Sequence, residues 1–171
     1  VDGVLLDHRA TKMLERRGEA AGLLLESAVE RGVGLVGVGT AAGGLPASEK
    51  LTRLLGRKPI ERLEDSQRGS GVTLDIPDQS HPATQCVTSL RLSAAVLQEG
   101  NETTTVLGRT ITVAPETPDR KHGGLSAFWT RTAGKGRIVV IALQEAPSSD
   151  AGMHRPTETA LAFLAARSLQ W

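Results

Sequence analysis

Residues 126–143 read SAFWTRTAGKGRIVVIAL, and this stretch decides the fold. Two runs of strand-forming residues, Ala127–Arg131 and Arg137–Leu143, flank the triplet Gly134-Lys135-Gly136. Glycine supplies the backbone geometry of a tight turn, and apolar runs of this length favour strands. The stretch therefore predicts a β-hairpin near the C-terminus.

Outward from this hairpin, strand and helix patterns alternate along the chain. We expect a turn at residues 8–11 and two strands between Thr105 and Val113. The remaining expected elements are strands at Val1–Asp7, Leu35–Val38 and Val72–Ile76, with helices at Lys12–Arg31, Ser48–Leu55 and from Pro156 onward. This order predicts an α/β fold with a mainly parallel sheet, in a single domain spanning residues 1–171.

The composition excludes several classes of partner. Lys plus Arg is 20 and Asp plus Glu is 19, which gives a net charge of +1 and no electrostatic case for nucleic acid or an anionic membrane. Aromatic residues are 2% of the chain, so stacking on bases or sugar rings has little to work with. The single cysteine, Cys86, excludes an internal disulfide and a thiolate zinc cluster. We expect a soluble protein without a membrane span or a signal peptide, in a compartment that the sequence leaves open.

Two short motifs are typical of cofactor or metal sites. Residues 37–42, GVGTAA, loosely fit the dinucleotide fingerprint, but Gly43, Gly44 and Pro46 prevent a helix from starting at once, so a plain strand-to-loop turn is favoured. Asp75, Asp78 and His81 follow one another at a spacing of three, as metal ligands can. Prolines at 77 and 82 break any helix that would align them, so a solvated loop is favoured and we expect no cofactor and no metal.

The hairpin tip carries two cations. Lys135 and Arg137 flank the turn and can hold a phosphate, although such a pair is more often a solvated hairpin tip.

The stretch at residues 126–143 resembles the closing hairpin of the ThuA-like (trehalose-utilisation) family, a branch of the class I glutamine amidotransferase-like α/β fold. Further stretches resemble that family in the right order: Glu30–Val38, Leu51–Gly56, the His81-Pro82-Ala83-Thr84 loop that follows Asp78, and the last helix, which ends at Trp171. The similarity covers essentially the whole chain. It implies a flavodoxin-like three-layer sandwich.

The resemblance also shows which family positions are changed. The family places a histidine, an acidic pair, a tyrosine and a Gly-His pair around its pocket. This chain has at those positions Gly39, Ala94, Ala95, Leu97, Gln144 and Glu145. Most of these residues cannot transfer protons or bind metal, so the chain is interpreted as a protein without catalytic activity. The retained motif, interpreted as structural, comprises His81, Pro82, Trp129, Gly134, Lys135, Gly136 and Arg137.

Two functional hypotheses follow. The first is a non-catalytic structural or interaction domain, a subunit or part of a larger assembly. The second is a carbohydrate-metabolism enzyme acting on sugars or keto-sugars, with Glu145, His81 and Asp78 as its catalytic candidates. A nucleotide-binding Rossmann protein rests on the glycine motif alone.

The family's domain normally begins with a strand, a helix and a strand before the position of Val1. We therefore expect an N-terminally incomplete domain, whose strand at Val4–Leu6 pairs with other protein subunits or with that segment.

Overall fold

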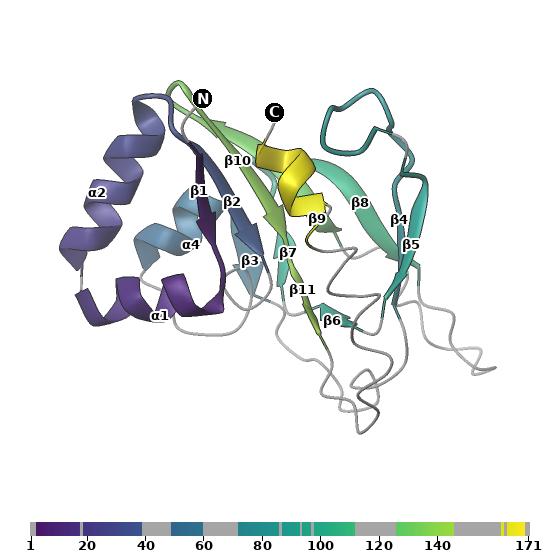
Figure 1. The fold of residues 1–171 in the computed structure, drawn as a ribbon, viewed down its shortest axis with the longest axis horizontal. Coiled ribbons are helices and arrows are strands. Elements are labelled where there is room, and N and C mark those ends of the chain that lie inside the picture. Colours follow the sequence, from purple (N-terminus) through teal and green to yellow (C-terminus); the bar gives the residue numbers. More distant parts are fainter. Residues whose placement is uncertain are drawn as a thin grey trace.

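The predicted hairpin lies inside a seven-strand sheet in the computed structural model (Figure 1). Its strands are β9 (Ser126–Ala133) and β10 (Gly136–Ile141), which pair antiparallel with Val140 opposite Trp129. The hairpin near the C-terminus is thus confirmed. The structure describes residues 3–17, 19–38, 49–59, 72–85, 87–92, 94–96, 98–111, 126–145, 162 and 164–169.

On one side of the hairpin the sheet is parallel. β2 (Gly34–Val38) pairs in parallel with β10, and β1 (Gly3–Leu6) pairs in parallel with β2. Parallel neighbours need a crossover connection, which α1 (His8–Arg17) and α2 (Glu19–Glu30) supply between β1 and β2.

The predicted turn at residues 8–11 and the single helix Lys12–Arg31 are wrong. The structure has two helices, and the first already begins at His8. The Asp7 carboxylate accepts a hydrogen bond from the Ala10 backbone N–H at 2.8 Å, which caps the helix and explains its early start. The sequence has Gly18 between α1 and α2, and glycine is a poor helix former.

On the other side of the hairpin the sheet is antiparallel. β8 (Thr105–Ile111) pairs with β9, and β4 (Val72–Asp75) lies between β8 and β5 (Ser89–Leu92). The order is β1-β2-β10-β9-β8-β4-β5. Two pairings are parallel and four are antiparallel, so the prediction of a mainly parallel sheet is wrong.

The physical reason is connectivity. Among the described residues, α1 and α2 return the chain so that β1 and β2 pair in parallel, whereas the two-residue turn between β9 and β10 forces an antiparallel pair. The two strands predicted between Thr105 and Val113 are the single strand β8. Its register against β9 shifts on either side of Gly108, which is the irregularity of a β-bulge.

Two further pairs of short strands were not predicted. β3 (Arg57–Pro59) pairs with β7 (Gln98–Gly100), and β6 (Ala94–Val96) pairs with β11 (Leu143–Glu145). Strands of three residues carry too little periodicity to be recognised from sequence.

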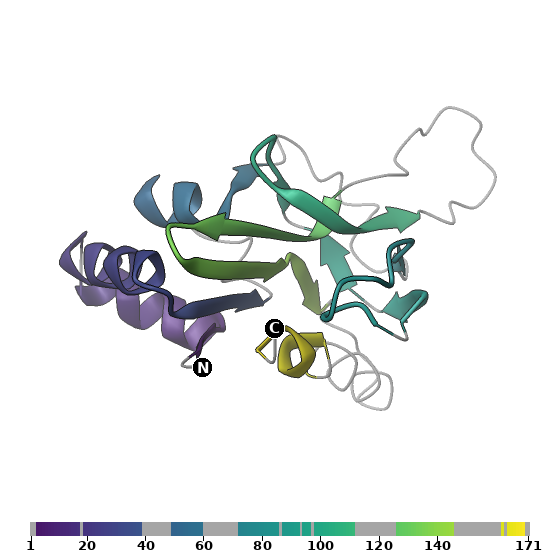
Figure 2. The same cartoon turned by 90° about the horizontal axis from the view of Figure 1, so that it is seen from above.

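The sheet has an apolar core on each face. On one face Val36, Phe128, Val139 and Ile141 pack with Leu164 of the helical residues 164–169. On the other face are the sheet residues Leu35, Trp129, Ile138 and Val140, with Leu25 and Val29 of α2 and Leu51, Leu54 and Leu55 of α4 (Glu49–Leu55). Figure 2 shows α4 and residues 164–169 on opposite sides of the sheet. The α/β fold with three layers is therefore confirmed.

The helices are short and pack against the faces of the sheet. α2, with 12 residues, buries Leu25 and Val29 against it. Within the described part of the chain, no helix combines the length and the apolarity that crossing a membrane requires.

Candidate functional site

The replaced family positions lie at the carboxyl end of β10. There β11 pairs antiparallel with β6, which places Gln144 opposite Ala95 and Glu145 opposite Ala94. These four positions are brought together by backbone pairing. Gly39 and Leu97 lie outside the described residues, although Gly39 follows the last residue of β2 directly in the chain.

The loop at residues 76–88, between β4 and β5, carries the other two catalytic candidates. The Asp78 carboxylate accepts hydrogen bonds from the Ser80 hydroxyl at 2.6 Å and from the Ser80 backbone N–H at 2.8 Å. Both bonds favour the ionised carboxylate and hold the pKa of Asp78 below its ordinary value. Asp78 is exposed, and its role in this geometry is to fold the turn.

His81 is partly buried in the same loop. Its Nδ1 accepts a hydrogen bond from the Ala83 backbone N–H at 3.1 Å. Burial lowers the pKa of His81 below its ordinary value; the charge of Asp78 raises this pKa, and that of Arg137 lowers it. A nitrogen that accepts carries no proton, so the ring is neutral with its proton on Nε2.

Thr84 and Pro82 complete the loop. Thr84 is fully buried, and its hydroxyl lies 2.6 Å from the Asp78 carbonyl oxygen and 2.9 Å from that of His81. Pro82 is exposed. The loop is thus closed on itself by its own side chains.

The three catalytic candidates are divided between the two ends of the sheet. Arg137 begins β10 and is close enough to His81 for its charge to lower the histidine pKa. Glu145 follows Arg137 by eight residues of extended chain, roughly 25 Å. Figure 1 accordingly places the loop between β4 and β5 at one end of the sheet and β11 at the other. Among the described residues, no three His, Cys, Asp or Glu side chains gather in a way that could hold a metal ion.

Close contact with α2 requires glycine at two positions of the hairpin turn. A Cβ atom on Gly134, whose φ is 58°, would lie 2.6 Å from the Glu30 carbonyl oxygen. A Cβ atom on Gly136 would overlap the carbonyl oxygen of Val29. The Lys135 backbone N–H between them donates to the Glu30 carbonyl at 2.9 Å. The turn therefore caps the C-terminus of α2 through its backbone.

Trp129 joins β9 to α4. Its ring is fully buried, and Nε1–H donates to the Leu55 carbonyl oxygen at 2.9 Å. Two strand positions on, the Arg131 guanidinium donates to the Arg53 carbonyl oxygen. Both contacts satisfy carbonyls in the last turn of α4, which have no partner within the helix.

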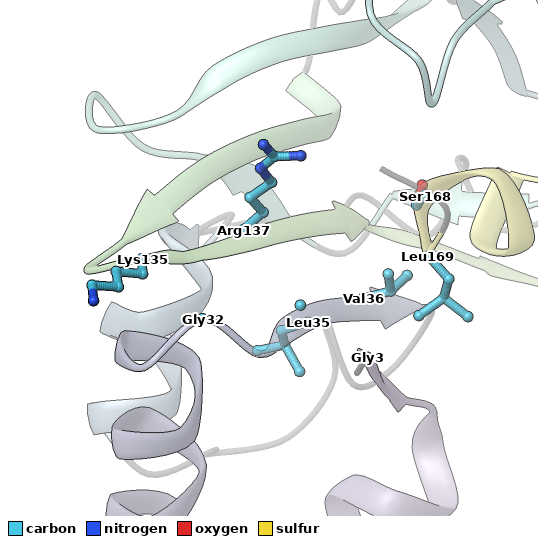
Figure 3. A pocket seen from close by; sticks show the side chains of 9 residues that line it. Gly3, Gly32, Leu35, Val36, Lys135, Arg137, Ser168 and Leu169 are labelled. Carbon is cyan, nitrogen blue, oxygen red and sulfur yellow. The ribbon is translucent and has the colours of Figure 1, made fainter. Parts of the chain in front are cut away.

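A pocket of about 260 Å³ opens at the amino ends of the parallel strands (Figure 3). It lies between the hairpin turn and helical residues 164–169. Its lining combines three glycines, three apolar residues and three polar ones: Gly3, Gly32, Gly34, Leu35, Val36, Leu169, Lys135, Arg137 and Ser168. Sequence reasoning singled out only the two cations, because the position of a C-terminal helix against β1 and β2 leaves no local signal.

β1 forms one edge of the seven-strand sheet. It pairs with β2 on one side, and no described strand pairs with it on the other. Leu5 on this strand is 46% exposed, and Leu169, which lies beside Gly3, is 37% exposed. The edge thus combines open backbone groups with apolar surface.

Comparison with known proteins identifies the fold. A protein from Parabacteroides merdae described as ThuA-like matches 90% of this chain with a TM-score of 0.64 and 13% identity, and this chain spans 64% of its length. A cytoplasmic protein from Salmonella typhimurium matches 99% of this chain, with a TM-score of 0.62, 11% identity and 70% of its own length covered.

A β-galactosidase from Bacillus circulans matches over 93% of this chain but only 20% of its own, with a TM-score of 0.51 and 14% identity. No family model and no curated protein matches the sequence. At these identities the likeness concerns the fold alone, and the chain has a ThuA-like fold.

Proposed function

We propose that this chain is a degenerate member of the ThuA-like family that acts as a non-catalytic interaction domain within a larger assembly. Its partner is an extended apolar segment of another polypeptide, which adds to the open edge of β1 as a further strand. The observation that carries the proposal is the exposure of Leu5 on an edge strand.

The physical argument starts from the backbone of β1. A strand at the edge of a sheet presents a row of N–H and C=O groups to any segment able to pair with them. Proteins usually protect such an edge with charge, proline or a bulge, and β1 has the sequence GVLL instead. An added strand makes main-chain hydrogen bonds there, and its apolar side chains cover Leu5 and Leu169.

The arrangement of residues beyond the carboxyl end of β10 supports a role without catalysis. The strand pair β6–β11 places two alanines, Ala94 and Ala95, opposite Glu145 and Gln144. His81, with Asp78 in the same loop, lies near Arg137 at the other end, so Glu145 has neither of the other two candidates beside it. The β-galactosidase match supports the larger assembly alone, since there this fold makes up one fifth of a longer polypeptide.

The association state of the purified chain tests the proposal. Without its partner, the open edge pairs with the same edge of a second copy, and native mass spectrometry across a concentration series detects dimers or larger species. Leu5→Lys places a charge on the edge and shifts the population to monomer. The matched control is Leu24→Lys, since Leu24 is 70% exposed on α2 and keeps the association unchanged. A wild-type chain that stays a monodisperse monomer at every concentration refutes the proposal.

A second candidate is the carbohydrate enzyme, favoured by the likeness to a β-galactosidase domain. In that case Glu145 is the base at the carboxyl end of the sheet. Thermal shift against disaccharides and keto-sugars at millimolar concentration separates the two candidates. A stabilisation that disappears in Glu145→Gln supports the enzyme, and the absence of any shift supports the interaction domain.

A further inference from the structure

The pocket at the amino ends of β1, β2 and β10 lies at the end of the sheet opposite β6 and β11. Ligands of open α/β sheets normally bind at the carboxyl ends of the parallel strands. This pocket therefore lies apart from the replaced family positions, but it shares Gly3 and Leu169 with the edge proposed for the partner strand.

The pocket owes its space to missing side chains. Gly3 and Gly34 face each other across the β1–β2 pair, and Gly32 precedes β2. A Cβ atom on Gly3 would lie 3.0 Å from Leu169 Cδ2, so the leucine forms a wall directly over the strand. Val36, which is 2% exposed, adds apolar surface deeper in the sheet. One part of the pocket is thus apolar.

The other part carries positive charge. Lys135 and Arg137 are both cations, and none of the nine lining residues is acidic. The C-terminal end of α2 lies nearby, but the carbonyls of Val29 and Glu30 already accept hydrogen bonds from the Gly32 and Lys135 backbone N–H groups at 2.9 Å. These carbonyls therefore present little negative charge to a ligand.

Figure 3 shows Lys135 and Arg137 along one side of the pocket and Ser168 with Leu169 on another. The Ser168 hydroxyl donates to the Leu164 carbonyl at 2.7 Å, which leaves its oxygen able to accept a hydrogen bond from a ligand. A ligand that matches both parts has a compact anionic group at the cations and a short apolar body against Leu169.

We propose that this pocket binds a small organic anion of the short-chain carboxylate class. The volume of about 260 Å³ lies below the range of drug-sized sites, which suits a ligand of metabolite size. Both cations are exposed to solvent, so the electrostatic part is modest and the affinity is millimolar.

Heteronuclear NMR on the full 171-residue chain tests this with four probes: butyrate, n-butylammonium, 1-butanol and inorganic phosphate. We expect butyrate to give saturable shifts at the amides of Gly32, Gly34, Lys135 and Leu169. Binding of the neutral alcohol is about tenfold weaker, and the ammonium ion gives no shift there. Inorganic phosphate, which lacks the apolar body, also binds less tightly than butyrate.

Two variants test which side chains supply the positive charge that binds butyrate. Lys135→Gln and Arg137→Gln each weaken butyrate binding several-fold, whereas Arg9→Gln, at an exposed arginine of α1, leaves it unchanged. Thermal denaturation checks that each variant is folded. The proposal is overturned if 1-butanol or phosphate binds as tightly as butyrate, if the shifts map elsewhere, or if Arg9→Gln weakens binding as much as the pocket variants.

Discussion

The hairpin turn at residues 134–136 touches α2 through its backbone, whereas the loop at residues 76–88 is folded by its own side chains. In the turn, Gly134 and Gly136 leave room for the carbonyls of Glu30 and Val29. In the loop, Asp78, His81 and Thr84 each bond to a neighbour within six residues. Both segments carry motifs that resemble the ThuA-like pattern. The turn joins parts of the chain that are distant in sequence through its backbone, whereas the loop does so through a side chain, since Arg167 donates to the Gln85 carbonyl oxygen at 3.4 Å.

The two regions are expected to differ in how much a substitution destabilises the fold. A backbone contact at van der Waals distance cannot adapt to an added methyl group, because the interior is close-packed. A side-chain hydrogen bond near the surface is partly replaced by water when it is lost. The glycine contacts of the turn are therefore expected to be more sensitive to substitution than the exposed hydrogen bonds of the loop, and the substitutions below compare the two regions.

Gly136→Ala is expected to have the largest effect. Its Cβ would overlap the Val29 carbonyl, so either α2 or the turn must move, at a cost of about 3 kcal/mol in the free energy of unfolding. Gly37→Ala is the matched control within the same sheet. Its Cβ would lie at an ordinary 3.5 Å from Leu55 Cδ2, and the cost stays within about 1 kcal/mol. Urea denaturation measures both, and equal midpoints would contradict the close contact.

The turn is also where sequence reasoning worked best. Glycines on both sides of Lys135, between two apolar runs, indicate a hairpin turn from the local sequence alone. The prediction holds in the fold because such a turn depends little on distant residues. The break between α1 and α2 was missed because the apolar spacing continues across Gly18, while the cap at Asp7 was not recognised. The antiparallel half was missed because strand direction depends on connections that carry no periodicity.

The candidate site residues also divide into those whose proximity was predicted from the sequence and those whose proximity was not. The resemblance picked out Ala94, Ala95, Gln144 and Glu145 as neighbours of one pocket, and the structure pairs them in register. It gave no indication that His81 lies near Arg137 at the far end of β10. The order of strands in the sequence does not show which strands are neighbours in the sheet. It therefore cannot show how close the loop between β4 and β5 lies to β10, a strand several positions away in the sheet.

Thr84→Val and Thr130→Val compare the two regions at buried hydroxyls. The Thr130 hydroxyl donates to the Ile138 carbonyl at 2.8 Å across a hairpin that its ladder already holds, so its loss costs about 0.5–1 kcal/mol. The single proton of the Thr84 hydroxyl is shared between the Asp78 and His81 carbonyl oxygens in a loop that no strand ladder holds, and its loss costs about 1–2 kcal/mol. Thermal denaturation of the two variants gives the ranking, and a larger loss in Thr130→Val would reverse this account of the loop.

The smallest expected effect is a pH dependence confined to the loop. Because burial lowers the pKa of His81 in the folded state, the unfolded chain binds more protons between the two pKa values. The contribution of the neutral ring is therefore fully present above the unfolded pKa, near 6.5, and is lost as the pH falls through the lower folded value.

His81→Asn tests this without removing the loop contact, since its side-chain oxygen can accept the Ala83 N–H while carrying no titratable proton. The melting temperature of the wild type should fall more than that of His81→Asn between about pH 8 and about pH 5. Asp78 and Glu19 titrate below this interval because hydrogen bonds from Ser80 and Lys50 hold their pKa values below the ordinary ones. A difference between the two melting temperatures that stays constant across the interval would mean that His81 is not desolvated in the folded chain, and that the loop is open where the structure closes it.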